Sequence, residues 1–190
     1  MEAIDLLKSR RSVLVKNLTS PGPDKEDLQQ ILEVGLRVPD HGKIGPWRIQ
    51  VITPKGQKTL GDLAAKIFTN KYGERATEKQ IEAERQRPQR APVLLVVTSD
   101  IKSPHKIPEL EQQLSGGAVC MNILNAAHAL GYSAQWVTEW LSFDTEIKAA
   151  LGHQDQTDII GMIYIGTAVE PPQPRSRPPL DEIVSEWSGP

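Results

Sequence analysis

Two uninterrupted apolar runs constrain the fold of this chain more than any other feature. They are PVLLVVTS, residues 92–99, and DIIGMIYIGTA, residues 158–168. A strand with one face in water alternates polar and apolar residues, whereas a strand covered on both faces reads as a continuous apolar run. The two runs therefore predict central strands of one sheet that is covered by helices.

A long helix between these runs is the second strong signal. It is predicted over residues 108–130, where the second half, AVCMNILNAAHAL, is apolar nearly all the way round, and Gly131 ends it. A helix without a polar face is covered on every side. Two arrangements satisfy this requirement: the helix runs through the middle of the protein, or it packs against a second subunit.

Weaker periodic patterns predict the remaining elements. Strand 47–53 alternates Trp47, Ile49 and Val51 with polar residues, so we expect these three on its more buried face and the strand at the margin of the sheet. A further strand is expected over 132–138. Helices are expected over residues 2–10, 24–37 with Asp24 as N-cap, 57–70, 75–87 and 144–151.

No repeat or linker divides the sequence, so we expect an α+β or mixed α/β fold in a single domain over residues 1–190. From about residue 169 the composition becomes proline-rich, in VEPPQPRSRPPLDEIVSEWSGP. Such a segment does not fold on itself. We expect residues 169–190 to form an extended arm that lies on another surface, of this chain or of a partner.

Charge and composition exclude several classes of protein. The net charge of −2 and the absence of a basic stripe argue against a nucleic-acid partner. No run of about 18 apolar residues suggests a membrane span, and the N-terminus lacks the pattern of a signal peptide, so a cytoplasmic location is expected. The single cysteine, Cys120, rules out an intrachain disulfide, and four scattered histidines predict no metal site.

Common catalytic motifs are missing, but basic residues cluster near both ends of the chain. The sequence contains no G-x-G-x-x-G after a strand, no P-loop and no G-x-S-x-G. KSRRS supplies Arg10, Arg11 and Ser12, and RSR supplies Arg175 and Arg177. The planar guanidinium suits a phosphate, but basic residues at a helix C-terminus also commonly lie in water. The residues alone leave both interpretations open.

The order of several motifs resembles the flavin-dependent nitroreductase family, and within it the small single-domain bacterial NAD(P)H nitroreductases. The likeness covers most of the chain. The segments that carry it are RRS (10–12), RVPDHGKIGPWR (37–48), RAPVLLVV (90–97), LEQQLSGGAV (110–119) and IYIGT (163–167).

The resemblance implies a nitroreductase-like central sheet, mixed or antiparallel, and a homodimer with FMN at its interface and the C-terminal extension on the partner subunit. It implies that NADH or NADPH donates hydride and that a nitroaromatic or quinone-like acceptor takes the electrons in a second step. Two alternatives stay open: another flavin reaction on the same scaffold, such as desaturation or flavin fragmentation, and a flavin-binding protein without enzymatic activity.

The resemblance also implies roles for individual residues, with the chemistry carried by FMN and no catalytic side chain. Arg10, Arg11 and Ser12 match the phosphate segment, and Arg175 and Arg177 match the tail that assists it. The predicted flavin contacts are Arg37, His41 and Lys43 in the opening loop and Trp136, Val137 and Thr138 in a strand. The segment from Ala126 to Gly131 matches one assigned to the nicotinamide. The chain departs from the wider family at Leu14, Asp40, Lys43 and Gly45.

Overall fold

The two apolar runs form neighbouring strands at the centre of the sheet. In the computed structural model, which describes residues 2–189, β3 (Val93–Ser99) pairs antiparallel with β5 (Asp158–Ala168). Leu94 to Val97 and Met162 to Ile165 are fully buried. The prediction of central strands covered on both faces is therefore confirmed.

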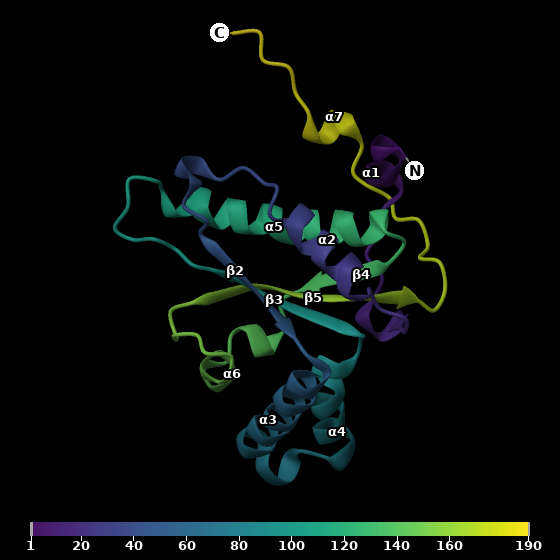
Figure 1. Cartoon of the computed structure of the whole chain (residues 1–190), viewed down its shortest axis with the longest axis vertical. Helices are drawn as coiled ribbons and strands as arrows, with labels where there is room; N and C mark the ends of the chain where they lie inside the picture. Colours follow the sequence, from purple (N-terminus) through teal and green to yellow (C-terminus); the bar gives the residue numbers. More distant parts are fainter. Residues whose placement is uncertain (1, 190) are drawn as a thin grey trace.

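The sheet is antiparallel at every described pairing (Figure 1). Its order is β1-β5-β3-β2, with β4 (Ser133–Val137) also paired to β5. β2 (Trp47–Ile52) lies at the margin, as predicted, but Val51 is 42% exposed, so its expected place on the more buried face was wrong. β1 (Leu18–Thr19) was not predicted, because two residues carry no periodicity.

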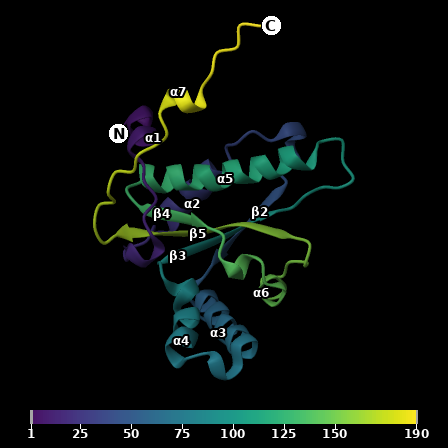
Figure 2. The same ribbon diagram turned by 180° about the vertical axis from the view of Figure 1, so that it is seen from behind.

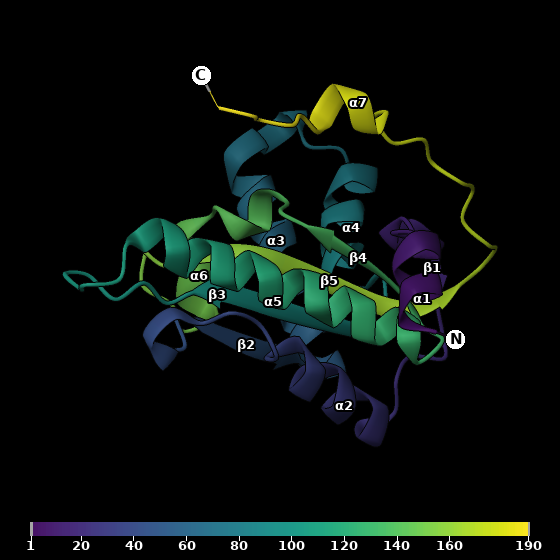
Figure 3. The same ribbon diagram turned by 90° about the horizontal axis from the view of Figure 1, so that it is seen from above.

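Helix α5 (Glu109–Ala129) lies across one face of the sheet (Figures 1 and 3). Val119, Cys120 and Ile123 are fully buried against the sheet. Every residue from Ala118 to His128 is buried or half-buried, which confirms the expected cover of its second half. The first half differs. Leu110 and Leu114, one turn apart, are each 64% exposed.

The opposite face of the sheet is covered by α3 (Pro54–Tyr72) and α6 (Thr145–Ala150), with α4 (Glu78–Gln86) packed on α3 (Figure 2). Leu60 and Ile147 contribute to the core on this side. α3 starts three residues before the predicted position. The reason is local: Thr53 accepts a hydrogen bond from the Gly56 N–H at 3.1 Å, and Pro54 suits the first helical turn.

The remaining helices lie above α5 or beside it. α1 (Ala3–Ser9) contacts α5 and has no buried residue, α2 (Lys25–Gly35) runs along α5, and α7 (Leu180–Ile183) interrupts the exposed arm. None of the helices in residues 2–189 is long and apolar enough to cross a membrane. The 3-10 turns are η1 (Val15–Asn17), η2 (His41–Lys43), η3 (Gly73–Arg75), η4 (Arg87–Gln89) and η5 (Trp140–Ser142).

Candidate functional site

Four arginines from the two ends of the chain line one cavity. Arg10 and Arg11 follow α1, and Arg175 and Arg177 lie in the arm, which passes beside α1 (Figures 1 and 2). We call these four residues the arginine cluster. The cavity has a volume of about 670 Å³ and is also lined by residues of α1 and by two arm prolines. The structure thus brings together the basic segments that the sequence analysis singled out.

The arginine cluster has unused hydrogen-bond donors. Arg10 Nη1 and Arg11 Nε are buried and have no hydrogen-bond partner among residues 2–189. Burial, and then the positive charges of Arg177 and Arg11, lower the pKa of Arg10. Buried donors without partners and cations that repel one another are both unfavourable, and a bound anion relieves both. These residues therefore fit the phosphate of a ligand such as FMN.

Hydrogen bonds fix the start of the chain against β4 and the end of α5. His128 Nε2 lies 2.7 Å from the Arg11 carbonyl oxygen, and the Val13 N–H donates to the Ala134 carbonyl at 3.2 Å. The Val15 N–H donates to Gln135 Oε1 at 2.6 Å. The arginine cluster and β4 therefore belong to one side of the same protomer. Ser12, between these anchors, is exposed.

Trp136 lies in β4 beside the middle of α5. Its Nε1 donates to the Ile160 carbonyl at 2.8 Å, and its side chain is partly exposed. A Cβ placed on Gly117 would lie 3.9 Å from the Trp136 ring, and one placed on Gly161 would lie 2.8 Å from its Nε1. Glycine at position 161 is therefore required for the ring to lie there. Val137 is half-buried and Thr138 is exposed.

The loop before β2 docks on the first half of α5. The Asp40 carboxylate accepts hydrogen bonds from the Ile44 N–H at 3.2 Å and the Gly45 N–H at 2.9 Å. Ser115 Oγ donates to the Pro39 carbonyl at 2.7 Å, and His41 Nδ1 lies 2.7 Å from Glu111 Oε2. The loop, which sequence alone describes as a polar turn, is thus held by side chains at several points.

Lys43 and Arg37 present exposed side chains from this region. Lys43 has a φ of 56°, and it is the one non-glycine residue with positive φ in residues 2–189. Its Cβ makes this conformation unfavourable. The Arg37 carbonyl accepts a hydrogen bond from Asn122 Nδ2 at 3.1 Å, which ties it to the middle of α5.

The predicted flavin contacts therefore form two groups within one protomer. One group lies at the C-terminal end of α5, where His128 contacts Arg11, and the other lies near its N-terminal end, where Glu111 contacts His41. At a rise of about 1.5 Å per residue, His128 and Glu111 are about 25 Å apart along the helix. Seen from above, β4 and α2 lie on opposite flanks of α5 (Figure 3). One group comprises the arginine cluster, Ser12 and β4, and the other comprises Arg37, His41 and Lys43.

Comparison with known proteins assigns the family. The model of the Nitroreductase family matches residues 7–167. The chain belongs to the Nitroreductase family. It is 34% identical, over 88% of both chains, to the Escherichia coli (strain K12) protein named "Putative NAD(P)H nitroreductase YdjA". The resemblance that the sequence motifs indicated is confirmed.

Solved structures confirm the nitroreductase-like α+β fold. A nitroreductase-like family protein from Bacillus cereus superimposes with a TM-score of 0.84 at 23% identity, over 100% of this chain and 97% of the other. The FMN and NADPH-dependent nitroreductase NfnB from Sphigopyxis sp. strain HMH, in a variant form, superimposes with a TM-score of 0.73 at 22% identity, over 100% of both chains.

The segment assigned by resemblance to the nicotinamide lies at the C-terminal end of α5 in this nitroreductase-family chain. Ala126 is 5% exposed and belongs to the core cluster around Ile123. Gly131 is exposed, with a φ of 89° that suits glycine after a helix. Of this segment, Gly131 offers surface to a ligand and Ala126 offers little.

A charged network that the sequence analysis did not identify adjoins β4. Glu139 accepts from Arg90 Nη2 at 2.6 and 2.7 Å and from Arg87 Nη1 at 3.1 Å. Glu84 accepts from Arg87 Nε and Nη2, both at 2.6 Å, and from Trp140 Nε1 at 2.8 Å. We call Glu84, Arg87, Arg90 and Glu139 the paired network. Arg87 and Arg90 are three residues apart, so one helical turn presents both to the same partner. The sequence around the two arginines does not indicate that this partner is Glu139.

The pKa values of Glu84, Arg87 and Arg90 shift toward the charged forms. Burial alone would raise the pKa of Glu84, but hydrogen bonds from Arg87 and Trp140 outweigh it and the pKa is lowered. Burial likewise opposes the charge on Arg90, yet Glu139 raises its pKa. The neighbours of Glu84, Arg87 and Arg90 therefore favour the charged forms of these three side chains.

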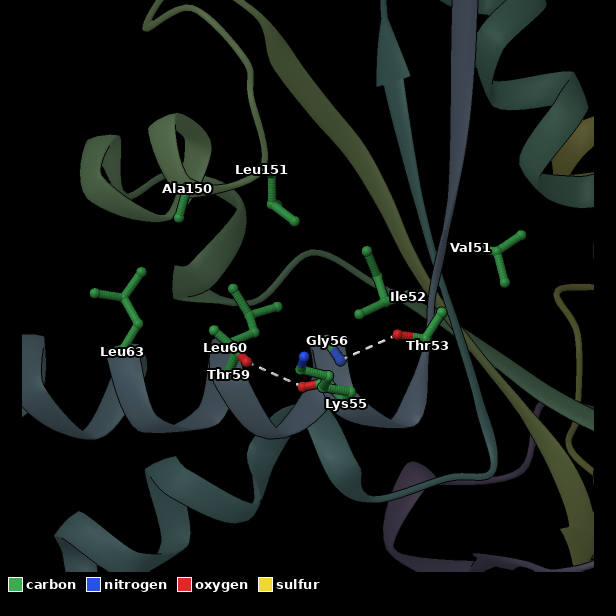
Figure 4. A pocket seen from close by; sticks show the side chains of 10 residues that line it. All are labelled: Val51, Ile52, Thr53, Lys55, Gly56, Thr59, Leu60, Leu63, Ala150 and Leu151. Atoms are coloured by element: carbon green, nitrogen blue, oxygen red, sulfur yellow. Dashed lines mark hydrogen bonds between the residues drawn. The ribbon is translucent and has the colours of Figure 1, made fainter.

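A separate apolar pocket of about 380 Å³ lies between the end of β2, the start of α3 and α6 (Figure 4). Ile52, Leu60 and Leu151 contribute to its lining. Two of its hydroxyls are used within the helix: Thr53 accepts from the Gly56 N–H, and Thr59 donates to the Lys55 carbonyl. Because the lining is mostly apolar and these hydroxyls are occupied, the pocket offers a polar ligand little besides Lys55.

Proposed function

We propose that this protein is an FMN-dependent oxidoreductase that takes hydride from NADH or NADPH and passes electrons to nitroaromatic or quinone-like acceptors in two separate steps. The name of the Escherichia coli relative and the FMN and NADPH dependence of NfnB support this reaction class. The observation that carries the proposal is the arginine cluster, with its buried donors open to a phosphate.

In this proposal the chain's residues hold the cofactor at several points. Arg10, Arg11 and Ser12, with Arg175 and Arg177 from the arm, bind the phosphate. Trp136 to Thr138, on the side of α5 that the arginine cluster also occupies, would hold the ring system. FMN, when bound, supplies the redox chemistry by accepting hydride from the nicotinamide and reducing the acceptor. If water delivers the proton to the acceptor, no acid or base residue of the chain is required.

The second group of contacts implies a homodimer. Since Arg37, His41 and Lys43 lie on the other flank of α5, a second copy with its α5 antiparallel would bring this group to the first copy's arginine cluster and β4. Each site then takes residues from both subunits. Exposed apolar side chains provide surface for this contact: Ile4, Leu7, Leu110, Leu114, Leu180, Ile183, Val184 and Trp187.

In such a dimer the cationic or N–H groups of Arg37, His41 and Lys43 would face the flavin ring. Fixed positive charge or aimed donors at the pyrimidine side of the ring stabilise electron density that arrives there. We therefore assign these residues a role in tuning the cofactor. An Arg37→Ala protein with wild-type FMN affinity and wild-type reduction rate would remove Arg37 from this group.

The purified protein tests the proposal directly. We expect a yellow protein with a flavin spectrum, bleached by NADH or NADPH without oxygen and recoloured by a nitroarene. Bleaching without recovery by any nitroarene or quinone would favour a different flavin reaction, and flavin binding without bleaching would favour a carrier role. A colourless monomer whose unfolding midpoint does not rise with FMN would reject the proposal.

Mixing two defective variants tests whether each site is shared. Arg10→Ala and His41→Ala damage opposite groups, so each homodimer should bind FMN poorly. If a site takes Arg10 from one subunit and His41 from the other, random remixing of subunits restores about one quarter of the sites. If both residues act within one subunit, remixing restores none.

A further inference from the structure

The paired network begins where the proposed flavin strand ends. Pairing of β4 with β5 stops at Val137, opposite Met162, and the chain turns at Glu139, whose carbonyl accepts from the Ser142 N–H at 2.8 Å. Thr138 lies between these two points. Its position therefore depends on the strand on one side and on the side chain of Glu139 on the other.

The anchors of Glu139 are themselves held in place. Arg90 lies over the ring of Tyr164, 5.2 Å from its centroid, and its Nε donates to the Arg87 carbonyl at 2.8 Å. Tyr164 is fully buried in β5, and its hydroxyl also donates to the Arg87 carbonyl, at 3.2 Å. Nη2 of Arg90 donates to both oxygens of Glu139, and the Arg90 guanidinium is itself fixed through Nε and the Tyr164 ring, so Glu139 is held relative to β5.

The next residue of the turn is tied to the same network. Trp140 donates from Nε1 to Glu84, which also binds Arg87. The two carboxylates and two guanidiniums cancel in charge and use one another's donors and acceptors. A partly buried network of this kind fixes a local geometry and leaves no net charge to attract an outside ligand.

We infer that Arg87 and Arg90 are positioning residues, which set the place of Thr138 at the flavin through Glu139. The inference rests on the proposed function, because it takes Thr138 as a flavin contact. Neither arginine needs to touch the cofactor. A small displacement of a binding group lowers rates strongly, so a change in this turn should reach the flavin environment through the backbone.

The test compares an arginine-to-lysine substitution at Arg90, in the paired network, with the same substitution at nearby Arg85, outside it. Arg90→Lys keeps the charge but loses the planar guanidinium, and with it the Nε bond to the Arg87 carbonyl. Arg85→Lys makes the same change in α4, where Arg85 contacts Asp62 and Glu82. For Arg90→Lys we expect the FMN dissociation constant to rise, and the rate of reduction by NAD(P)H to fall, each by about tenfold. The visible circular dichroism of bound FMN should change as well. Arg85→Lys should alter none of these.

A double variant separates positioning from stability. Arg90→Met with Glu139→Leu removes both members of the partly buried pair together, and such apolar replacements commonly keep the stability of the fold. We expect its denaturant midpoint to stay near wild type while FMN affinity and visible circular dichroism remain altered.

Two results would overturn the inference. One is an Arg90→Lys protein with wild-type affinity, spectrum and reduction rate. The other is a double variant in which affinity and spectrum recover together with stability. A wild-type protein that binds no FMN would reject the proposed function itself, and that result is read before any variant is made.

Discussion

Two arginine-rich regions of this chain are built in opposite ways. In the paired network Arg87 and Arg90 face Glu84 and Glu139, and carboxylate neighbours raise the pKa of both arginines. In the arginine cluster the four cations line one cavity, and burial and the charges of Arg177 and Arg11 lower the pKa of Arg10. Residue type is the same in both places, and only the partners differ.

The difference separates structure from binding. A guanidinium that already binds a carboxylate has its charge balanced and its N–H donors bonded, so it stabilises the fold. A guanidinium with buried, unused donors costs free energy until an anion arrives. The arginine cluster is therefore open to a ligand from outside the chain, and the paired network is complete by itself.

The largest expected effect comes from breaking the paired network. Glu139→Ala leaves Arg87 short of one partner and Arg90 without its carboxylate. We expect a loss of about 3 kcal/mol in the free energy of unfolding, at the lower end for a buried pair, because the Glu139 side chain is 19% exposed. Chemical denaturation measures it. Glu82→Ala, which breaks an exposed pair with Arg85 in α4, is the control and should cost no more than about 1 kcal/mol.

The arginine cluster should respond in the opposite sense. Arg10→Ala removes an unpaired cation together with its repulsion from Arg177 and Arg11, so the free energy of unfolding without ligand should stay the same or rise. The effect appears with ligand: FMN at 100 times its dissociation constant stabilises the wild type by about 2.7 kcal/mol, and Arg10→Ala at the same FMN concentration should lose most of that. Thermal unfolding with and without FMN measures it. Equal stabilisation of both proteins by FMN would mean that the arginine cluster does not bind the phosphate.

Acid should weaken the paired network, because protonation of Glu84 removes one of its charges. The pKa of Glu84 lies below its ordinary value of 4.5, so its contribution is fully present above about 4.5 and is lost as the pH falls through the folded-state pKa. We expect Glu84→Gln to flatten the fall in unfolding free energy in this acid range by on the order of 1 kcal/mol. Glu82→Gln, in the same helix, should leave the slope as in wild type. Identical slopes in wild type and Glu84→Gln would contradict the assignment.

The sequence alone predicted the arginine cluster but not the paired network. The central strands and the covered half of α5 were predictable because a continuous apolar run is stable only where it is covered on all sides. The arginine cluster was predictable as a group because its members stand in two compact basic motifs, RRS and RSR. The sequence could not show that the donors of Arg10 and Arg11 are left unused.

The paired network escaped prediction because its partners are far apart along the chain. Glu84 and Arg87 lie in segment 75–87, whose sequence predicts a charged, solvated helix, and Glu139 lies more than 45 residues beyond Arg90. The misplacement of Val51 has a related cause. Alternation within a strand predicts two faces, but the exposure of each face depends on which helices cover it.

The smallest expected effect concerns Lys43, a cation that belongs to neither the paired network nor the arginine cluster. Lys43 is held in a left-handed conformation by a loop that Asp40, Ser115 and His41 anchor. Lys43→Gly removes a strain of about 1 kcal/mol and adds unfolded-state entropy worth about 0.5 kcal/mol, so a net gain of about 0.5 kcal/mol in unfolding free energy is expected. If Lys43 contacts FMN in the dimer, the same variant should bind FMN more weakly although it is more stable. Lys43→Asn, which tolerates this conformation without the charge, should lose FMN affinity to the same extent. Unchanged affinity in both variants would show that Lys43 faces solvent, and that the strained backbone serves the loop rather than the cofactor.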